Sequence, residues 1–420
     1  MQNISGANNR VILALIGAGG RGTDVALSMK KNIPDVEIKY VCDVDDTRGG
    51  RVIDEVSGLQ EHKPLRVVDM RQVFDDKDVD AVLICTPEHW HALASIWACE
   101  AGKDVYVEKN ISLNIAEGRK MIETARKYKR IVQCGTQNRS AEYSLTAREY
   151  IQSGKLGTVF HVKCFCMLPG GKPWFLKSDS DVPEGLNWDL WLGPAEKVPY
   201  NVSRHKAWYD WWAYSGGAAL AGDASHVMDL ARLATGDPGH PDSVYCKGGR
   251  VLFDDKRDVP DIQSITYDYK NFSLSCVSSQ FGDYMAKSDA SVRYGNKFPD
   301  WRLNATRIEI YGTEGMMYLG RHGGGWQVVS NDGEVVAQEY GLFPDVGHQK
   351  NFIEAIQTGK LPNGDIEQGH FTATLVHMAN ISYRMGNKQL FFDPESETFT
   401  NSKEANELCV INYREGFEVR

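Results

Sequence analysis

The segment VILALIGAGGRG, residues 11–22, constrains the fold of this chain more than any other stretch. Its first six residues are apolar and have the length of a buried strand. They lead directly into the run Gly17-Ala18-Gly19-Gly20-Arg21-Gly22, which fits the pattern G-x-G-x-x-G. Residues 23–31 continue as a predicted helix. Strand, glycine turn and helix in this order are the context that a dinucleotide-binding turn requires.

Each glycine of the motif has a separate physical role. Gly17 permits the tight turn, Gly19 lets the backbone approach a pyrophosphate, and Gly22 allows the helix to pack closely on the strand. The N-terminal amides of the helix then point at the phosphates. We therefore predict that the loop, including Gly20 and Arg21, binds a dinucleotide cofactor.

An acidic residue lies where such a fold needs one. Residues 36–42 are predicted to form a second strand, which ends at Asp43, about 20 positions beyond the last glycine of the motif. A carboxylate at this place accepts hydrogen bonds from the adenosine ribose and repels a 2′-phosphate. The cofactor is accordingly predicted to be NAD rather than NADP, although Arg48 nearby weakens that preference.

Strands and helices alternate as far as residue 134. Further strands are expected at 65–68, 81–85, 104–107 and 131–134, and helices at 48–58, 92–101 and 115–128. This alternation predicts a doubly wound parallel sheet with its ligand beyond the carboxyl ends of the strands. Polar residues at or near those ends are expected to contact the cofactor, namely Thr86, Pro87, His89, His91, Glu108, Lys109 and Gln137. No third ligand accompanies the two histidines, so we predict no metal site.

The composition of the chain changes beyond residue 140. A helix is expected at 143–153 and a strand at 158–167, followed by strands at 243–251, 261–269, 272–280, 306–312, 315–319 and 325–330 and helices at 347–359 and 366–385. The prediction is an α/β chain with a Rossmann domain at 10–140. An α+β domain on a largely antiparallel open sheet is predicted at 141–420.

Aromatic residues cluster between residues 174 and 214. The cluster comprises Trp174, Phe175, Trp188, Trp191, Trp208, Tyr209, Trp211, Trp212 and Tyr214. Buried tryptophans are usually core, but rings also stack on sugar faces, and long irregular segments are often functional. We favour a wall of the substrate site that includes Trp174 and Trp208.

Charge and cysteine usage exclude some functions. A net charge of −9 argues against a general nucleic-acid binder, and no apolar run is long enough to span a bilayer. The nine cysteines form no C-x-x-C pair and are expected to be buried free thiols of a reducing compartment. The N-terminus lacks the features of a secretory signal. A cytoplasmic protein is predicted, and a periplasmic one stays open if a leader was removed.

Several motifs occur together in a characteristic order: the glycine loop, TPEHWHA, AGKDVYVEK, GTQNRS and SGGAALAGDASHVMDL. From about residue 10 to about 386 the chain resembles the Gfo/Idh/MocA oxidoreductases, which include glucose-fructose oxidoreductase and inositol dehydrogenase. The resemblance implies a sugar or glycoside substrate. It also implies a homodimer or homotetramer formed through the open sheet face.

The resemblance assigns chemistry to Lys109. The corresponding family motif is E-K-P with a catalytic lysine, and here Asn110 replaces the proline. At a strand end beside a nicotinamide, a lysine can hydrogen-bond a substrate hydroxyl and help to remove its proton. Arg139, in the GTQNRS segment, is predicted to contact the substrate.

His226 is the predicted proton acceptor, because it matches the family's catalytic histidine and histidine titrates near neutral pH. The family places an acid four residues earlier, where this chain has Gly222, and Asp223 stands one step closer. Asp223 either reaches the substrate after a local shift or caps the helix. Asp229 is expected to be structural rather than to orient the imidazole.

The main functional hypothesis is an NAD-dependent dehydrogenase that oxidises a secondary hydroxyl of a sugar, cyclitol or glycoside. A second hypothesis uses the same cofactor without net redox change, with transient oxidation acidifying a neighbouring C–H bond so that a glycosidic substituent is eliminated. The third hypothesis, a non-catalytic sensor of dinucleotide and sugar, rests on the departures at Asn110 and Gly222.

Overall fold

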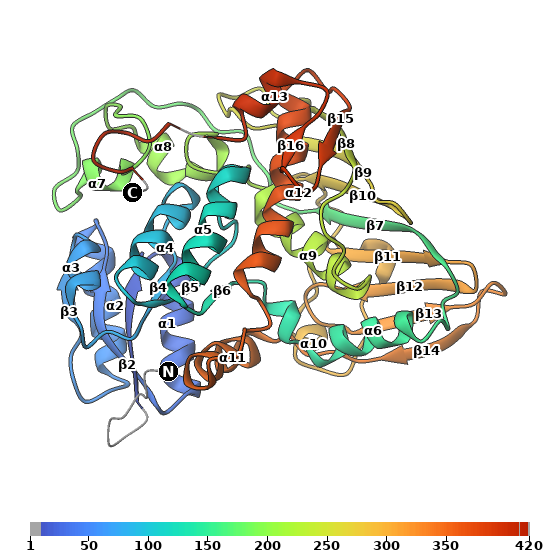
Figure 1. Cartoon of the computed structure of the whole chain (residues 1–420), viewed down its shortest axis with the longest axis horizontal. Coiled ribbons are helices and arrows are strands. Elements are labelled where there is room, and N and C mark those ends of the chain that lie inside the picture. Colours follow the sequence, from blue (N-terminus) through green and yellow to red (C-terminus); the bar gives the residue numbers. More distant parts are fainter. Residues whose placement is uncertain (1–9, 411, 419–420) are drawn as a thin grey trace.

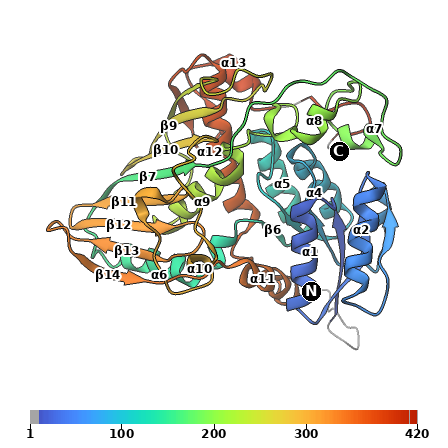
Figure 2. The same ribbon diagram turned by 180° about the vertical axis from the view of Figure 1, so that it is seen from behind.

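The computed structural model describes residues 10–410 and 412–418. Residues 1–9 lie outside the described residues. They belong to the N-terminal region in which no secretory signal is expected. Two sheet-based units lie side by side, with helix α12 (Ile366–Arg384) between them (Figures 1 and 2). None of the helices described is both long and apolar enough to span a membrane.

The first unit is a parallel sheet with helices on both faces. Its strands are β1 (Val11–Ile16), β2 (Val36–Cys42), β3 (Leu65–Val67), β4 (Ala81–Ile84), β5 (Asp104–Val107) and β6 (Val132–Cys134). Its helices are α1 (Gly20–Asn32), α2 (Asp46–Ser57), α3 (Arg71–Asp75), α4 (His91–Glu100) and α5 (Ile115–Tyr128). The strand order β3-β2-β1-β4-β5-β6 is that of a doubly wound dinucleotide-binding fold, which confirms the prediction. Helices α4 and α5 cover one face, and α1 and α2 cover the other (Figures 1 and 2).

The second unit is built on a ten-stranded sheet. Its strands are β7 (Val159–Met167), β8 (Ser243–Gly249), β9 (Ile262–Asp268), β10 (Ser273–Ser279), β11 (Arg307–Gly312), β12 (Gly315–Gly320), β13 (Trp326–Val329), β14 (Val335–Glu339), β15 (Leu390–Asp393) and β16 (Thr398–Phe399). Its helices are α6 (Glu142–Gln152), α7 (Trp188–Leu192), α8 (Val202–Lys206), α9 (Ser225–Ala234), α10 (Ala290–Arg293), α11 (Asp345–Thr358), α12 and α13 (Lys403–Glu407). Of its strand pairs only β7 and β10 run parallel, so the largely antiparallel sheet is confirmed.

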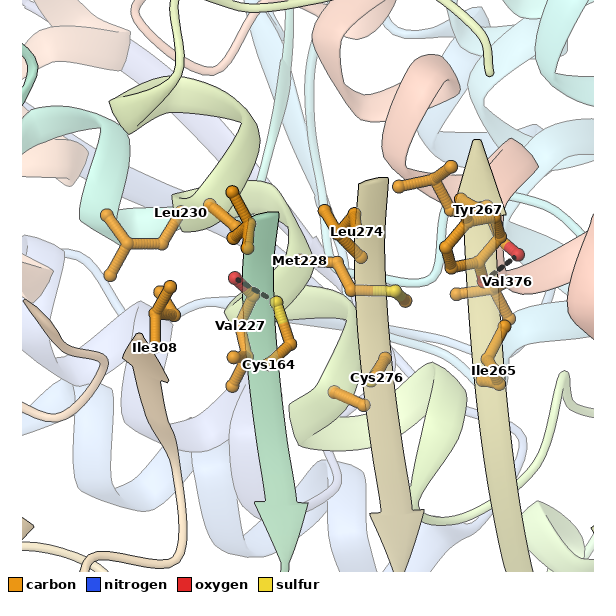
Figure 3. Close-up of a cluster of buried hydrophobic side chains, with 14 of the residues drawn as sticks. Cys164, Val227, Met228, Leu230, Ile265, Tyr267, Leu274, Cys276, Ile308 and Val376 are labelled. Carbon is orange, nitrogen blue, oxygen red and sulfur yellow. Dashed lines mark hydrogen bonds between the residues drawn. The ribbon is translucent and has the colours of Figure 1, made fainter. Parts of the chain in front are cut away.

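Helix α9 is fastened to this sheet by apolar side chains. Val227, Met228 and Leu230 are fully buried against the sheet, where they meet Cys164 on β7 and Cys276 on β10 (Figure 3). Burial of each such aliphatic side chain stabilises the fold by about 1.5–3 kcal/mol. The helix that carries His226 is therefore held rigidly.

Residues late in the chain return to the first unit. Phe352 and Ile353 of α11 join the core formed by α1 and β1, and Phe417 packs edge-on against Trp90 at 5.6 Å between ring centroids. The division at residue 140 thus separates the two sheets, while α11 and the C-terminal tail pack on the first of them. All nine cysteines are free, and all except the half-buried Cys85 are buried, as predicted.

Candidate active site

A cleft of about 300 Å³ lies along the carboxyl ends of the parallel strands. It is lined by Ile16, Gly17, Gly19, Gly20, Arg21, Cys42, Asp43, Val44, Arg48, Val68, Met70, Cys85, Thr86, Pro87, Trp90, His91, Glu108, Lys109, Leu190, Trp191, His205 and Trp208. The cleft therefore gathers the glycine loop, the acid after β2 and the residues after β4 and β5 from widely separated parts of the chain.

The glycine loop is shaped by close backbone packing. Gly17 has φ +92°, and a Cβ there would lie 2.7 Å from the carbonyl carbon of Cys85. A Cβ on Gly22 would lie 2.0 Å from the carbonyl oxygen of Gly17. At Gly20 a Cβ would meet nothing within 4 Å, because that residue faces the cleft. The loop thus presents bare backbone to a ligand, while Gly22 packs behind it and does not line the cleft.

Asp43 connects the end of β2 to this loop. Its carboxylate accepts hydrogen bonds from the amides of Ala18 (2.6 Å) and Asp45 (2.8 Å). Burial raises the pKa of the carboxyl group, and the two amides counteract that effect. Asp43 and Arg48 both line the cleft. The carboxylate that favours NAD and the arginine that weakens this preference therefore lie at the same end of the cleft.

Glu108 and His91 organise the other end of the cleft. Arg21 donates to Glu108 at 2.8 Å, and this charge pair holds the pKa of the buried Glu108 low despite desolvation. The ring of His91 lies between the carbonyl oxygens of Asn110 (2.7 Å) and Thr86 (2.8 Å). The hydroxyl of Thr86 is buried and has no hydrogen-bond partner within residues 10–410 and 412–418.

Besides Gly22, two residues predicted to contact the cofactor lie away from the cleft lining. His89 is buried between the rings of Trp191 and Tyr214, and one ring nitrogen lies 2.9 Å from the carbonyl oxygen of Trp191. Burial lowers the pKa of His89 to about 4, which keeps the ring neutral. Gln137 is buried beside the Tyr106 hydroxyl at 3.5 Å. Both residues therefore support the walls of the site.

Lys109 bridges the two units. Its ammonium group donates to the carbonyl oxygen of Ala221 at 3.4 Å, in the turn that precedes α9. The Lys109–Asn110 peptide bond is cis. The lysine at the end of β5 thus lies beside the segment that carries Asp223 and His226.

His226 is buried near the start of α9. Desolvation, followed by the positive charges of Arg321 and Lys109, lowers the pKa of its imidazole well below 6.5. The ring is therefore neutral at physiological pH, as a proton acceptor must be.

Asp223 lies in a π-helical turn, Leu220–Ala224, directly before α9. Burial would raise the pKa of its carboxyl group, but the charges of Arg321 and Lys287 hold the pKa below 3.8, and Lys287 forms an ion pair with it. The N-cap of α9 is Ala224, without a side-chain capping bond, so the capping interpretation of Asp223 is wrong. The alternative, that Asp223 lies on the substrate side, stays a prediction.

Arg139 forms two buried ion pairs. It contacts Asp229 at 2.8 Å and Asp237 at 2.9 Å, and Asp229 also accepts from Thr372 at 2.8 Å. Arg139 and Asp229 are both almost fully buried and lie outside the lining of the cleft. This placement favours a structural role for Arg139 rather than the predicted substrate contact, and it agrees with the structural role expected for Asp229.

The aromatic cluster builds a small core of its own. Trp188, Trp191, Trp211 and Tyr214 pack with Leu192 and Tyr200. The indole N–H of Trp174 donates to Asp210 at 2.8 Å, away from the cleft. Packing is thus the main role of the cluster, contrary to the favoured interpretation.

One edge of that core reaches the cleft. Trp208 lines it, together with Leu190, Trp191 and His205. Trp191 belongs to the aromatic cluster favoured as a wall, whereas Leu190 and His205 were not predicted, because nothing local in the sequence shows that the segment folds over the end of β2. The contact is made where Asn187 donates to the carbonyl oxygen of Val44 at 2.9 Å.

The fold and the cleft define a dinucleotide-dependent oxidoreductase, and comparison with known families agrees. Residues 11–136 match the NAD-binding Rossmann fold of the Gfo/Idh/MocA oxidoreductase family. Residues 195–318 match a Gfo/Idh/MocA C-terminal domain, and residues 311–419 match the family's C-terminal alpha/beta domain. The chain belongs to this family, and it is an NAD-binding dehydrogenase.

Individual relatives are distant. The uncharacterized oxidoreductase YrbE of Bacillus subtilis is 24% identical over 311 residues, which cover 73% of this chain and 72% of that one. The scyllo-inositol 2-dehydrogenase (NAD(+)) of the same organism is 28% identical over 165 residues, 39% of this chain and 47% of that one. The match therefore spans less than half of that dehydrogenase.

The fold is shared with solved structures. A levoglucosan dehydrogenase in complex with NADH and levoglucosan superimposes with a TM-score of 0.66 at 17% identity, covering 91% of this chain and 99% of that one. At this identity the likeness establishes the fold.

Proposed function

We propose that the protein oxidises a secondary hydroxyl group of a sugar, cyclitol or glycoside and transfers the hydride to NAD. The observation that carries the proposal is that Lys109, which lines the cleft, donates a hydrogen bond to Ala221 in the turn before His226. An inositol dehydrogenase among the relatives and a levoglucosan dehydrogenase among the structural neighbours support a polyhydroxylated substrate.

The cleft fits NAD by its own geometry. Gly19 and Gly20 leave room for a pyrophosphate at the start of α1, and Asp43 offers its carboxylate to the adenosine ribose. The unpartnered hydroxyl of Thr86 lies at the other end, where an amide or a ribose could satisfy it. When bound, NAD supplies the acceptor for the hydride.

Side chains of the protein remove the proton of the substrate hydroxyl group. The neutral imidazole of His226 accepts the hydroxyl proton as the carbon–hydrogen bond breaks. Lys109 donates a hydrogen bond to the same oxygen and stabilises the negative charge that develops there. Asp223, which forms an ion pair with Lys287, orients a neighbouring hydroxyl group of the substrate in this proposal.

A substrate screen tests the proposal. Sugars, cyclitols and glycosides are incubated with the protein and NAD, and NADH absorbance is followed together with the product mass. Accumulation of NADH with a product two mass units lighter is the expected result. Ligand-induced stabilisation without hydride transfer at any pH would instead establish a sensor.

A second candidate is glycoside cleavage through transient oxidation. The wall formed by Trp191, His205 and Trp208 against the glycine loop favours it, because a covered cofactor exchanges slowly and suits a cycle in which NAD is regenerated in place. Release of free sugar without NADH accumulation would select this reaction over simple dehydrogenation.

The proposed assembly of the protein rests on the family, and its proposed location rests on the free thiols. We propose a homodimer or homotetramer formed through the open face of the large sheet, where Tyr245 and Phe160 are exposed. The free thiols support a cytoplasmic location.

A further inference from the structure

Arg321 carries a buried guanidinium group that lacks an ionic partner. The residue directly follows β12 and is 4% exposed. Its Nε and Nη1 atoms are buried and have no hydrogen-bond partner among the described residues. The ring of Phe343 lies beside the charge, with its centroid 5.1 Å from the guanidinium carbon.

Other buried arginines among the described residues have ionic or hydrogen-bond partners, although Nη2 of Arg139 and Nε of Arg232 form no hydrogen bond. Arg139 pairs with two aspartates, and Arg257 contacts Asp255 at 2.6 Å and Asp210 at 3.7 Å. Arg232 donates to Gln368, Thr372 and the carbonyl oxygen of Pro238. An unpaired buried charge is strongly unfavourable, so Arg321 is the exception that calls for a ligand.

The carboxylates near Arg321 are already engaged. Asp223 forms its ion pair with Lys287, and one of its oxygens lies 3.7 Å from a ring nitrogen of His322. Asp345 pairs with Arg21 at 3.2 Å. Among the described residues, therefore, no carboxylate forms a direct ion pair with Arg321, and the charge of Asp223 offsets its burial only in part.

Arg321 lies near the predicted chemistry, because a ring nitrogen of the next residue, His322, is 3.7 Å from the carboxylate of Asp223. Among the charged groups that lower the pKa of His226, Arg321 and Lys109 contribute most, and Arg321 also stabilises the carboxylate form of Asp223. All these groups lie on the second unit or at its border with β5. The glycine loop and the N-terminus of α1, which suit the cofactor phosphates, belong to the first unit.

We propose that Arg321, with Lys109 and Lys287 beside it, binds an anionic substituent of the substrate, so that this dehydrogenase acts on an acidic sugar. The inference rests on the proposed function and specifies its substrate class. A guanidinium group binds carboxylate or phosphate through two parallel N–H···O bonds. In a site shielded from water such a pair is strong, and it discriminates against the neutral analogue.

The test compares acidic sugars with their neutral parents. D-glucuronate and glucose 6-phosphate are paired with D-glucose, and D-galacturonate with D-galactose, with NADH formation as the readout. We expect the wild type to prefer an acid by about 10-fold or more in kcat/KM, which corresponds to one charge-assisted contact. The better of glucuronate and glucose 6-phosphate shows whether the anion is a carboxylate or a phosphate.

Two substitutions at the same position sharpen the test. Arg321→Gln should lower kcat/KM for the acid by about 10- to 100-fold more than it lowers kcat/KM for the neutral sugar. Arg321→Lys should retain part of the preference. Arg302→Gln removes an arginine whose side chain is 85% exposed and paired with Asp300, and it should change neither value.

Thermal stability provides a readout without turnover. The acid should raise the Tm of the wild type loaded with NADH but not that of Arg321→Gln. Without ligand, Arg321→Gln should melt higher than the wild type, because the substitution removes an unpaired buried charge. A lower Tm of the ligand-free variant would mean that Arg321 is structural, and it would overturn the inference.

The remaining outcomes separate the two proposals. Equal kcat/KM for acid and neutral sugar, unchanged by Arg321→Gln, overturns the acidic substrate and leaves the dehydrogenase standing. A selective loss of NADH affinity in Arg321→Gln assigns the charge to the cofactor and overturns the inference as well. If no sugar is oxidised, the proposed function fails, and stabilisation of the wild type alone by the acid still supports the anion site.

Discussion

Glu88→Gln should make the protein more stable at alkaline pH. Glu88 is 4% exposed in the short turn Glu88–Trp90, where its carboxyl group accepts from the amide of Gly216 at 2.8 Å. Burial raises the pKa of this group from 4.5 to about 7, although the charge of Lys109 opposes the shift. The folded state therefore prefers the protonated acid.

The sign and size of the change in stability with pH follow from proton linkage. Because the folded pKa is the higher one, the contribution of Glu88 to stability is complete below pH 4.5 and is lost as the pH rises through about 7. At 1.36 kcal/mol for each pH unit, this interval corresponds to a loss of about 3 kcal/mol in the free energy of unfolding. A glutamine keeps the oxygen that accepts from Gly216 and does not ionise.

Urea unfolding followed by circular dichroism at pH 5 and pH 8 measures this difference. Relative to the wild type, Glu88→Gln should gain about 2–3 kcal/mol between the two conditions. Glu61→Gln, at an exposed position, controls for the general effect of removing a carboxylate. An offset between Glu88→Gln and wild type that is the same at both pH values would refute the account of a buried, protonated carboxyl group.

Three further substitutions test the cleft. Lys109→Met should lower kcat by about 10²–10⁴-fold while NAD binding, measured by fluorescence titration, stays within about 2-fold; unchanged turnover would remove the lysine from the mechanism. Gly22→Ala should abolish NAD binding, since its Cβ would lie 2.0 Å from the carbonyl oxygen of Gly17. Gly50 lies inside α2 with nothing within 4 Å of an added Cβ, so Gly50→Ala should raise the stability of the fold by about 0.5–1 kcal/mol. Equal effects of the two substitutions on NAD binding and on stability would contradict the packing argument. Asp43→Asn should weaken NAD binding by about 10-fold and narrow its advantage over NADP, as judged by the two dissociation constants; an unchanged ratio argues against ribose recognition by this carboxylate.

The sequence determines the first unit more closely than the second for a physical reason. Strands β1, β2 and β5 and helix α5 have the predicted bounds, because fully buried parallel strands are short apolar runs and the helix has clear amphipathic spacing. Strand β14 was missed, since its residues are mostly exposed and lack a buried alternating face. Strand β16 has only two residues and depends on pairing with β15.

The site residues also divide into those whose position the sequence predicts and those whose position depends on distant partners. Motif residues that lie next to a strand end, such as Thr86 and Lys109, line the cleft because local chain direction places them there. Arg139 and Trp174 also lie near motifs, but their partners Asp237 and Asp210 are far away in sequence. A buried ion pair outweighs a local pattern, and its partner is visible only once the fold is known.

The displaced acid of the GDASH segment can be explained by helix geometry. A π-helical turn closes i→i+5 hydrogen bonds and so holds one residue more than an α-helical turn. The amide of Ala224 donates to the carbonyl oxygen of Ala219 at 3.1 Å, which is such a bond, and Gly222 departs from helical geometry with ψ −108°. A shift of one residue, from the family's position at Gly222 to Asp223, is the change that this turn absorbs.

The same turn places Asp223 against Lys287, which no periodicity in the sequence relates to it. The glycine and the acid therefore form one feature. The displacement of the acid by one residue therefore has a structural cause in the additional residue that the π-helical turn holds.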